Sequence, residues 1–78
     1  MYDYSKLRGR IIEYYGTQEC FSKAMNLSLQ SISYKLNNRV PWRQQEIDLA
    51  CTRLNIKPTQ IREYFFKKKV EKNLTEGE

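Results

Sequence analysis

The segment of residues 16–38, GTQECFSKAMNLSLQSISYKLNN, constrains the fold more than any other part of the chain. Two apolar stripes recur in it at the three- or four-residue spacing of one helix face. They consist of Phe21, Ala24 and Met25, and of Ile32 and Leu36. Thr17 and Ser28 precede the stripes as favourable N-caps, and Asn26 between them tolerates the positive φ of a tight turn. The pattern predicts two short helices joined by that turn.

Three further segments have the same helical spacing, so the sequence predicts an all-α fold of five short helices. The apolar positions of these segments are Tyr4, Leu7, Ile11 and Tyr15; Ile47, Ala50, Cys51 and Leu54; and Ile61, Tyr64 and Phe65. Asp3 or Ser5 is expected to cap the first helix, and Gly16 to end it. Pro58 suits the first turn of the last helix.

A chain of 78 residues has room for one domain, here residues 1–78. We expect a compact core over about residues 4–66 and a charged, flexible tail over residues 67–78. Lys67, Lys68 and Lys69 open this tail, either as a solvated end or as a source of nonspecific attraction to DNA.

The charge balance favours a polyanionic partner. Lys and Arg number 14 against 9 Asp and Glu, a net charge of +5, and the sequence pI is about 9.4. Nucleic acid is the first expectation, and an anionic membrane surface the second. The polar start is unlike a signal peptide, and no apolar run is long enough to span a membrane. With Cys20 and Cys51 as its two cysteines, the chain is expected to be reduced and cytoplasmic.

The amino-acid composition does not support a catalytic site or a metal-binding site. The chain has no histidine, so a Ser-His or Cys-His pair is impossible, and two cysteines are too few for a structural zinc site. Three isolated glycines form no phosphate-binding loop. We therefore expect no enzyme activity, no cofactor, no metal and no small-molecule ligand.

The outer side of the helix that contains Ile32 and Leu36 is the candidate for reading DNA bases. The base-contacting candidates are Leu29, Gln30, Ser33 and Tyr34. A glutamine can pair with adenine N6 and N7, a leucine can touch a thymine methyl, and a small serine permits close approach. The alternative is that this is an ordinary solvent-exposed face. An exposed leucine argues against that alternative, because it gains nothing from water.

A second group of residues suits DNA phosphates. It comprises Thr17, Gln18, Lys35, Asn37, Asn38, Arg39 and Arg43. The free N–H groups and dipole at a helix start favour a phosphate oxygen, and clustered basic or amide side chains anchor a duplex without reading its sequence. The alternative is a solvated basic surface.

Two aromatic features have more than one interpretation. Trp42 is expected to close the core, with exposure at the phosphate edge as the second possibility. Phe65, which also belongs to the apolar face of the last helix, forms with Phe66 and Val70 a candidate apolar patch for a second copy of the chain.

With these residues in view, the chain resembles the phage Cro and repressor family of helix-turn-helix proteins, the lambda-repressor-like domains. The likeness covers about residues 4–66, with the helix-turn-helix over residues 17–38, and it is carried by Thr17-Gln18-Glu19, Leu27-Ser28, Ser31-Ile32-Ser33 and Lys35-Leu36-Asn37-Asn38. This chain differs from the usual residues of the family at four positions. Ser22 replaces an alanine, Asn26 the turn glycine and Leu29 a frequent glutamine, and Arg43 stands where a helix-capping residue is common.

The resemblance implies a function as well as a fold. Gln18 and Asn37 fall at phosphate-contacting positions, and Leu29, Gln30 and Tyr34 at base-reading ones. A member this short resembles Cro, which implies a repressor that binds a pseudo-palindromic operator as a homodimer, in the cytoplasm of a bacterial host. The alternative is a protein-interaction module, an antirepressor or modulator that binds another repressor through Leu29, Tyr34 and the Phe65-Phe66 patch.

Overall fold

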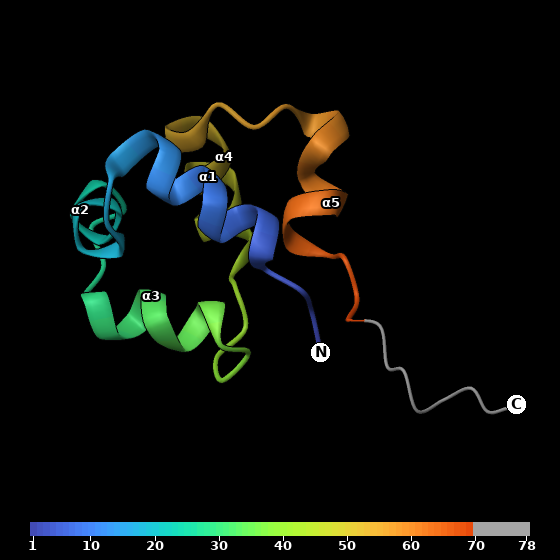
Figure 1. Ribbon diagram of the computed structural model, residues 1–78, viewed down its shortest axis with the longest axis horizontal. Coiled ribbons are helices and arrows are strands. Elements are labelled where there is room, and N and C mark those ends of the chain that lie inside the picture. Colours follow the sequence, from blue (N-terminus) through green and yellow to red (C-terminus); the bar gives the residue numbers. More distant parts are fainter. Residues whose placement is uncertain (70–78) are drawn as a thin grey trace, which may run out of the picture.

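The computed structural model describes residues 1–69 and confirms the all-α class (Figure 1). Five α-helices follow one another along the chain: α1 (Ser5–Tyr15), α2 (Gln18–Ala24), α3 (Leu29–Leu36), α4 (Gln44–Leu54) and α5 (Ile61–Phe65). A single 3-10 turn, η1 (Pro58–Gln60), precedes α5 and has Pro58 at its start. None of the helices in the described part is long and apolar enough to cross a membrane.

Helix α1 lies at the centre of the fold and contacts α2, α4 and α5 (Figure 1). The apolar stripes expected from the sequence meet around it in one core. The largest side chains that are fully buried there are Phe21, Phe65, Leu7, Ile11, Ile32 and Leu54. Ser22, buried where the similar family usually has alanine, donates its Oγ–H to the carbonyl of Glu19 at 2.7 Å. The hydroxyl is therefore satisfied inside the helix.

Thr17 and Ser28 cap α2 and α3 as predicted, whereas the N-cap residue of α1 is Tyr4, which makes no side-chain cap bond. The Asp3 carboxylate accepts from the Ser5 backbone N–H at 2.9 Å ahead of α1. The Thr17 hydroxyl accepts from the Cys20 N–H at 3.1 Å, and the Ser28 hydroxyl from the Ser31 N–H at 3.1 Å. Each bond satisfies one of the free N–H groups at a helix start.

Asn26 makes the turn between α2 and α3 with a φ of 59°. Its own N–H donates to the Lys23 carbonyl at 3.1 Å, and the next N–H, from Leu27, donates to Ser22 at 2.9 Å. The left-handed conformation strains any residue with a Cβ, although Asn less than most. The side chain itself is exposed, so the conformation alone accounts for this residue type.

Asn26→Ala should therefore lower the free energy of unfolding by about 1 kcal/mol, because alanine pays the full left-handed strain. Asn26→Gly is the matched control and should change it by no more than about 0.5 kcal/mol. Urea denaturation followed by circular dichroism measures both. Equal stability of the alanine and glycine variants would show that the turn does not depend on this conformation.

The two ends of the described chain are paired, which corrects the expected start of the tail. The Asp3 N–H donates to the Lys67 carbonyl at 2.6 Å, and the Lys69 N–H to the Met1 carbonyl at 3.2 Å. Tyr2 and Lys68 form an antiparallel bridge between them. Backbone pairing therefore holds residues 67–69 beside residues 1–3. The remainder of the predicted tail lies outside the described residues.

Candidate functional surfaces on helix α3 and around Trp42

The outer side of α3 is open to solvent in the described part of the chain. Ile32 and Leu36 face the core, and both are buried. On the opposite side, Leu29 is 45% exposed and Tyr34 37% exposed. Gln30 is also exposed, while Ser33 is half-buried. The sequence thus placed the buried and open sides of this helix correctly.

Polar groups on this side of α3 are already bonded to one another. The Gln30 side-chain amide donates to the Tyr34 hydroxyl at 2.8 Å. The Asn37 side-chain amide donates to the Ser33 carbonyl at 2.8 Å. The Arg39 guanidinium lies over the Tyr34 ring, 5.7 Å from its centroid. The bond to Tyr34 uses one of the two N–H groups of the Gln30 amide and leaves its oxygen and second N–H unpaired among the described residues, so it restricts the orientation of the amide without occupying all of its polar groups.

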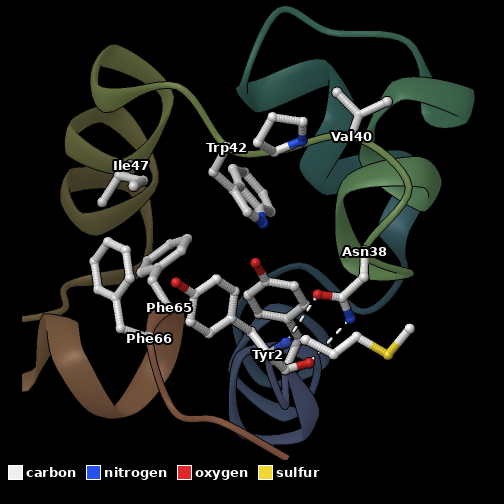
Figure 2. Close-up of a pocket in the computed structure, with 10 residues that line it drawn as sticks. Tyr2, Asn38, Val40, Trp42, Ile47, Phe65 and Phe66 are labelled. Atoms are coloured by element: carbon white, nitrogen blue, oxygen red, sulfur yellow. Dashed lines mark hydrogen bonds between the residues drawn. The ribbon is translucent and has the colours of Figure 1, made fainter.

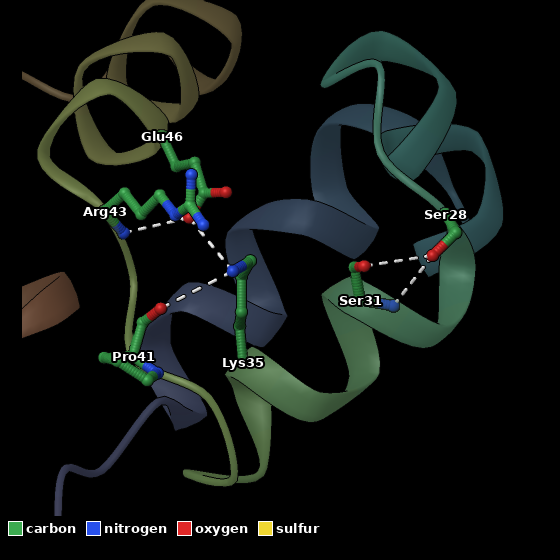
Figure 3. A network of polar contacts seen from close by, with 6 residues as sticks. All are labelled: Ser28, Ser31, Lys35, Pro41, Arg43 and Glu46. Atoms are coloured by element: carbon green, nitrogen blue, oxygen red, sulfur yellow. Dashed lines mark hydrogen bonds and ion pairs between the residues drawn. The ribbon is translucent and has the colours of Figure 1, made fainter.

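Lys35 is placed differently from the expectation of a phosphate contact. Its ammonium lies 3.1 Å from the Glu46 carboxylate, and its side chain is only 6% exposed (Figure 3). It also donates to the Pro41 carbonyl at 3.5 Å. The reason is the loop after α3, which brings the first turn of α4 back over Lys35 (Figure 3). A buried, paired ammonium is not available to a DNA phosphate in this conformation.

Arg43 lies at the N-cap of α4, a position where a short polar cap is common in the family that the chain resembles. The Glu46 side chain supplies the cap, because it accepts from the Arg43 backbone N–H at 2.9 Å (Figure 3). Glu46 therefore has two partners, the ammonium of Lys35 and this N–H. The Arg43 side chain is left exposed.

The other phosphate candidates divide into engaged and free side chains. Asn38 holds Tyr2 by two bonds, since its Oδ1 accepts from the Tyr2 N–H and its Nδ2 donates to the Tyr2 carbonyl, both at 2.9 Å. The Asn37 Oδ1 accepts from the Arg8 guanidinium at 2.9 Å. The Thr17 hydroxyl caps α2, and Gln18 beside it is half-buried. Arg39 is exposed.

A pocket that the sequence analysis missed lies on another part of the surface. It has a volume of about 480 Å³ and opens between the start of the chain, the loop after α3 and the end of α5 (Figure 2). Its walls are Met1, Tyr2, Tyr4, Asn38, Val40, Pro41, Trp42, Ile47, Phe65 and Phe66. These side chains come from segments far apart in the sequence, so no spacing motif could reveal them.

Trp42 forms one wall of this pocket and also packs on the core, as expected. Its indole meets the rings of Phe65 and Tyr4 edge-on, at centroid distances of 5.3 and 6.5 Å. The indole nitrogen is directed into the pocket (Figure 2). This nitrogen is buried and has no hydrogen-bond partner among the described residues. A buried donor without a protein partner is uncommon in proteins.

The rim of the pocket is apolar and exposed. Met1 is 80% exposed, Phe66 44% and Val40 37%. The Phe66 ring meets the Tyr2 ring edge-on at 5.8 Å. Phe65 differs from the expected patch because it is 1% exposed and belongs to the core. Val70, the third member of that patch, lies outside the described residues.

Basic residues are the chain neighbours of the pocket walls. Arg39 and Arg43 lie on either side of residues 40–42 in the loop, residues 67–69 follow Phe66, and all of these side chains are exposed. The pKa of Asp3 is lowered, first by its hydrogen bonds with Ser5 and further by the charges of Lys67 and Lys69. The lysines after α5 therefore lie close enough to this carboxylate to act on it. Of the two nearby carboxylates, Glu46 is neutralised by Lys35.

Comparison with known proteins identifies a family and a similar structure. Residues 1–68 match the family described as "Protein of unknown function (DUF739)". The chain is similar to a solved structure described as the solution structure of the modulator of repression (MOR) of the temperate bacteriophage TP901-1 from Lactococcus lactis. The two share 47% sequence identity with a TM-score of 0.76, over 90% of this chain and 95% of that chain. No curated protein sequence matches the chain. Because the family model spans most of its length, the chain belongs to the DUF739 family.

Proposed function

We propose that this chain is a phage regulatory protein that binds a repressor protein and changes its action on DNA. The observation that carries the proposal is the 47% identity to a phage modulator of repression along nearly all of both chains. This identity and coverage, with a TM-score of 0.76, extend the likeness over the whole fold rather than over one segment. The role is that of a binding protein in the bacterial host cytoplasm rather than of an enzyme.

The surfaces of the molecule support a protein partner. The polar groups of Gln30, Tyr34 and Asn37 are bonded within α3, and the best-placed lysine, Lys35, is buried against Glu46. Large apolar and aromatic side chains are exposed as well, among them Leu29, Val40 and Phe66. Interfaces between proteins are enriched in such residues, whereas DNA-facing surfaces depend on free charged and polar groups.

Operator binding by α3 remains the second candidate function, in the manner of a Cro-like dimer. The observation in its favour is that Leu29, Gln30 and Tyr34 are exposed on one side of the helix, with Arg39 stacked beside them. The net charge of +5 agrees with it. On this hypothesis Thr17, Gln18, Arg39 and Arg43 supply the phosphate contacts.

The test is a titration of a labelled operator duplex with a purified phage repressor from the genome that encodes this chain. We expect the added chain to shift the apparent repressor affinity by about tenfold, a typical size for coupling between two ligands. We expect no sequence-specific binding by the chain alone. Fluorescence anisotropy measures both quantities.

The opposite pattern would favour the second candidate. In that case the chain alone binds the duplex, repressor affinity is unchanged, and Gln30→Ala costs about 1–3 kcal/mol at the preferred site. Under the first proposal, Gln30→Ala has no specific effect on DNA binding, because the chain does not read bases.

A further inference from the structure

We propose that the pocket beside Trp42 binds an acidic segment of the partner repressor, which inserts one bulky apolar side chain and offers a carbonyl oxygen to the indole N–H. This inference rests on the proposed function, since it assumes a protein partner. The inference names the site of contact on this chain and the chemical character of the partner segment that binds there.

The unpartnered indole nitrogen is the first argument. Trp42 Nε1 is buried, lacks a partner among the described residues and is directed into the pocket (Figure 2). A buried donor gains most from an acceptor that arrives with a ligand, because its cost of losing water is already paid. The indole nitrogen is a donor only, so the incoming group must be an acceptor such as a carbonyl.

The shape and lining of the pocket are the second argument. A volume of about 480 Å³ lies within the range of roughly 300–1,000 Å³ that is usual for ligand pockets. Aromatic walls from Tyr2, Trp42 and Phe66 meet an exposed Val40 at the rim. Apolar anchors that enter such pockets carry most of the energy of many protein interfaces.

Charge is the argument for an acidic occupant. Residues 67–69 are exposed and are paired with residues 1–3, which form one wall of the pocket. Arg39 and Arg43 are exposed in the loop that supplies Val40 and Trp42 to the other wall. Of the carboxylates next to these walls, Glu46 is paired with Lys35, and Asp3 is bonded to Ser5 and lies near Lys67 and Lys69. A positive rim attracts carboxylates and repels a basic segment. The complementary partner segment therefore carries Asp or Glu next to its apolar anchor.

Trp42 offers a direct readout, because the chain has a single tryptophan. In the ¹⁵N-labelled chain its indole N–H gives one signal, and unlabelled purified repressor can be added to it. We expect that signal to move downfield as the complex forms. Complex formation with an unmoved indole signal overturns this inference and leaves the proposed function intact, whereas absence of any complex overturns both.

A matched pair of variants tests the charge of the occupant. Val40→Glu should weaken repressor binding by about tenfold through repulsion, whereas Val40→Lys should leave it equal or stronger. Val40 is exposed, so both chains should fold. Ile12→Glu, on the exposed side of α1 and outside the pocket, is the control and should bind normally. If Val40→Lys weakens binding as much as Val40→Glu does, the acidic assignment is wrong.

Trp42→Phe tests the donor itself. It keeps an aromatic ring and removes the N–H, so binding should fall by about fivefold while the melting temperature shows whether packing has suffered. Replacement of Trp42 by β-(3-benzothienyl)alanine, which has the indole shape without the N–H, should give the same loss. Normal binding by this isostere overturns the hydrogen bond. Sedimentation of the chain alone checks the remaining occupant, since a dimer broken by Val40→Glu would assign the pocket to a second copy.

Discussion

Phe65→Ala is expected to lower the free energy of unfolding by about 3–5 kcal/mol, the usual cost of removing a buried aromatic ring. Phe65 is 1% exposed and packs edge-on against the indole of Trp42, 5.3 Å between centroids. Its loss would leave a cavity between α5 and the loop after α3. A small domain has little stability in reserve, so the variant should be largely unfolded at 37 °C. Urea denaturation at 15 °C measures the change.

Phe66→Ala is the matched control at the next position. The Phe66 ring is 44% exposed and contacts Tyr2 from the surface. Its replacement should cost no more than about 1 kcal/mol. Similar losses for the two variants would contradict the division between a core residue and a pocket rim.

Glu46→Ala is the second large effect, with an expected loss of about 3 kcal/mol. The Lys35 side chain is 6% exposed and depends on Glu46 for its counter-charge at 3.1 Å. Removal of the carboxylate leaves a buried ammonium whose remaining partner among the described residues is the Pro41 carbonyl at 3.5 Å, and it also frees the Arg43 N–H at the start of α4. Denaturation in urea, at low and high salt, measures the loss.

A double-mutant cycle separates the charge from the cap. Glu46→Gln keeps an acceptor for the Arg43 N–H but removes the negative charge. This variant should therefore be less stable than the unaltered chain. Lys35→Met in that background should recover most of the loss, because methionine needs no counter-charge. A Glu46→Ala loss below about 1 kcal/mol would mean that water reaches Lys35, and would return this lysine to the candidates for DNA phosphate.

The helices and the core could be predicted from the sequence because their signals are local. The spacing of Ile32 and Leu36 determines which side of α3 is buried, and Asn26 marks the turn before it. Caps at Thr17 and Ser28 lie within three residues of the groups that they satisfy. Patterns over so few residues can be recognised in a single amino-acid sequence.

The features that the sequence did not predict depend on contacts between distant residues. Lys35 was predicted to contact DNA phosphate because of its positive charge and its place near the end of α3. Its partner Glu46 is eleven positions later in the chain, and the three- or four-residue spacing of a helix face does not predict such a contact. Tyr2 is bonded to Asn38 across the fold, which also explains why the pocket has a wall from the first residues. Phe65 and Phe66 are the same residue type at adjacent positions. Which of the two is buried depends on how α5 is oriented against the core.

The interpretation of α3 shows the same limit for function. The exposure of Leu29, Gln30 and Tyr34 could be predicted, but the bond between Gln30 and Tyr34 could not, because several rotamers of both side chains are open on a free helix. The similarity to a phage modulator of repression is what favours a protein partner over DNA bases.

Isothermal titration of the chain into purified phage repressor, with no DNA present, tests the central claim most directly. We expect a saturable complex with a dissociation constant in the micromolar range or tighter, about −8 kcal/mol or more favourable. We expect no matching heat with the operator duplex alone. Sequence-specific binding of the chain to the duplex, without any complex with the repressor, would contradict a protein-binding role.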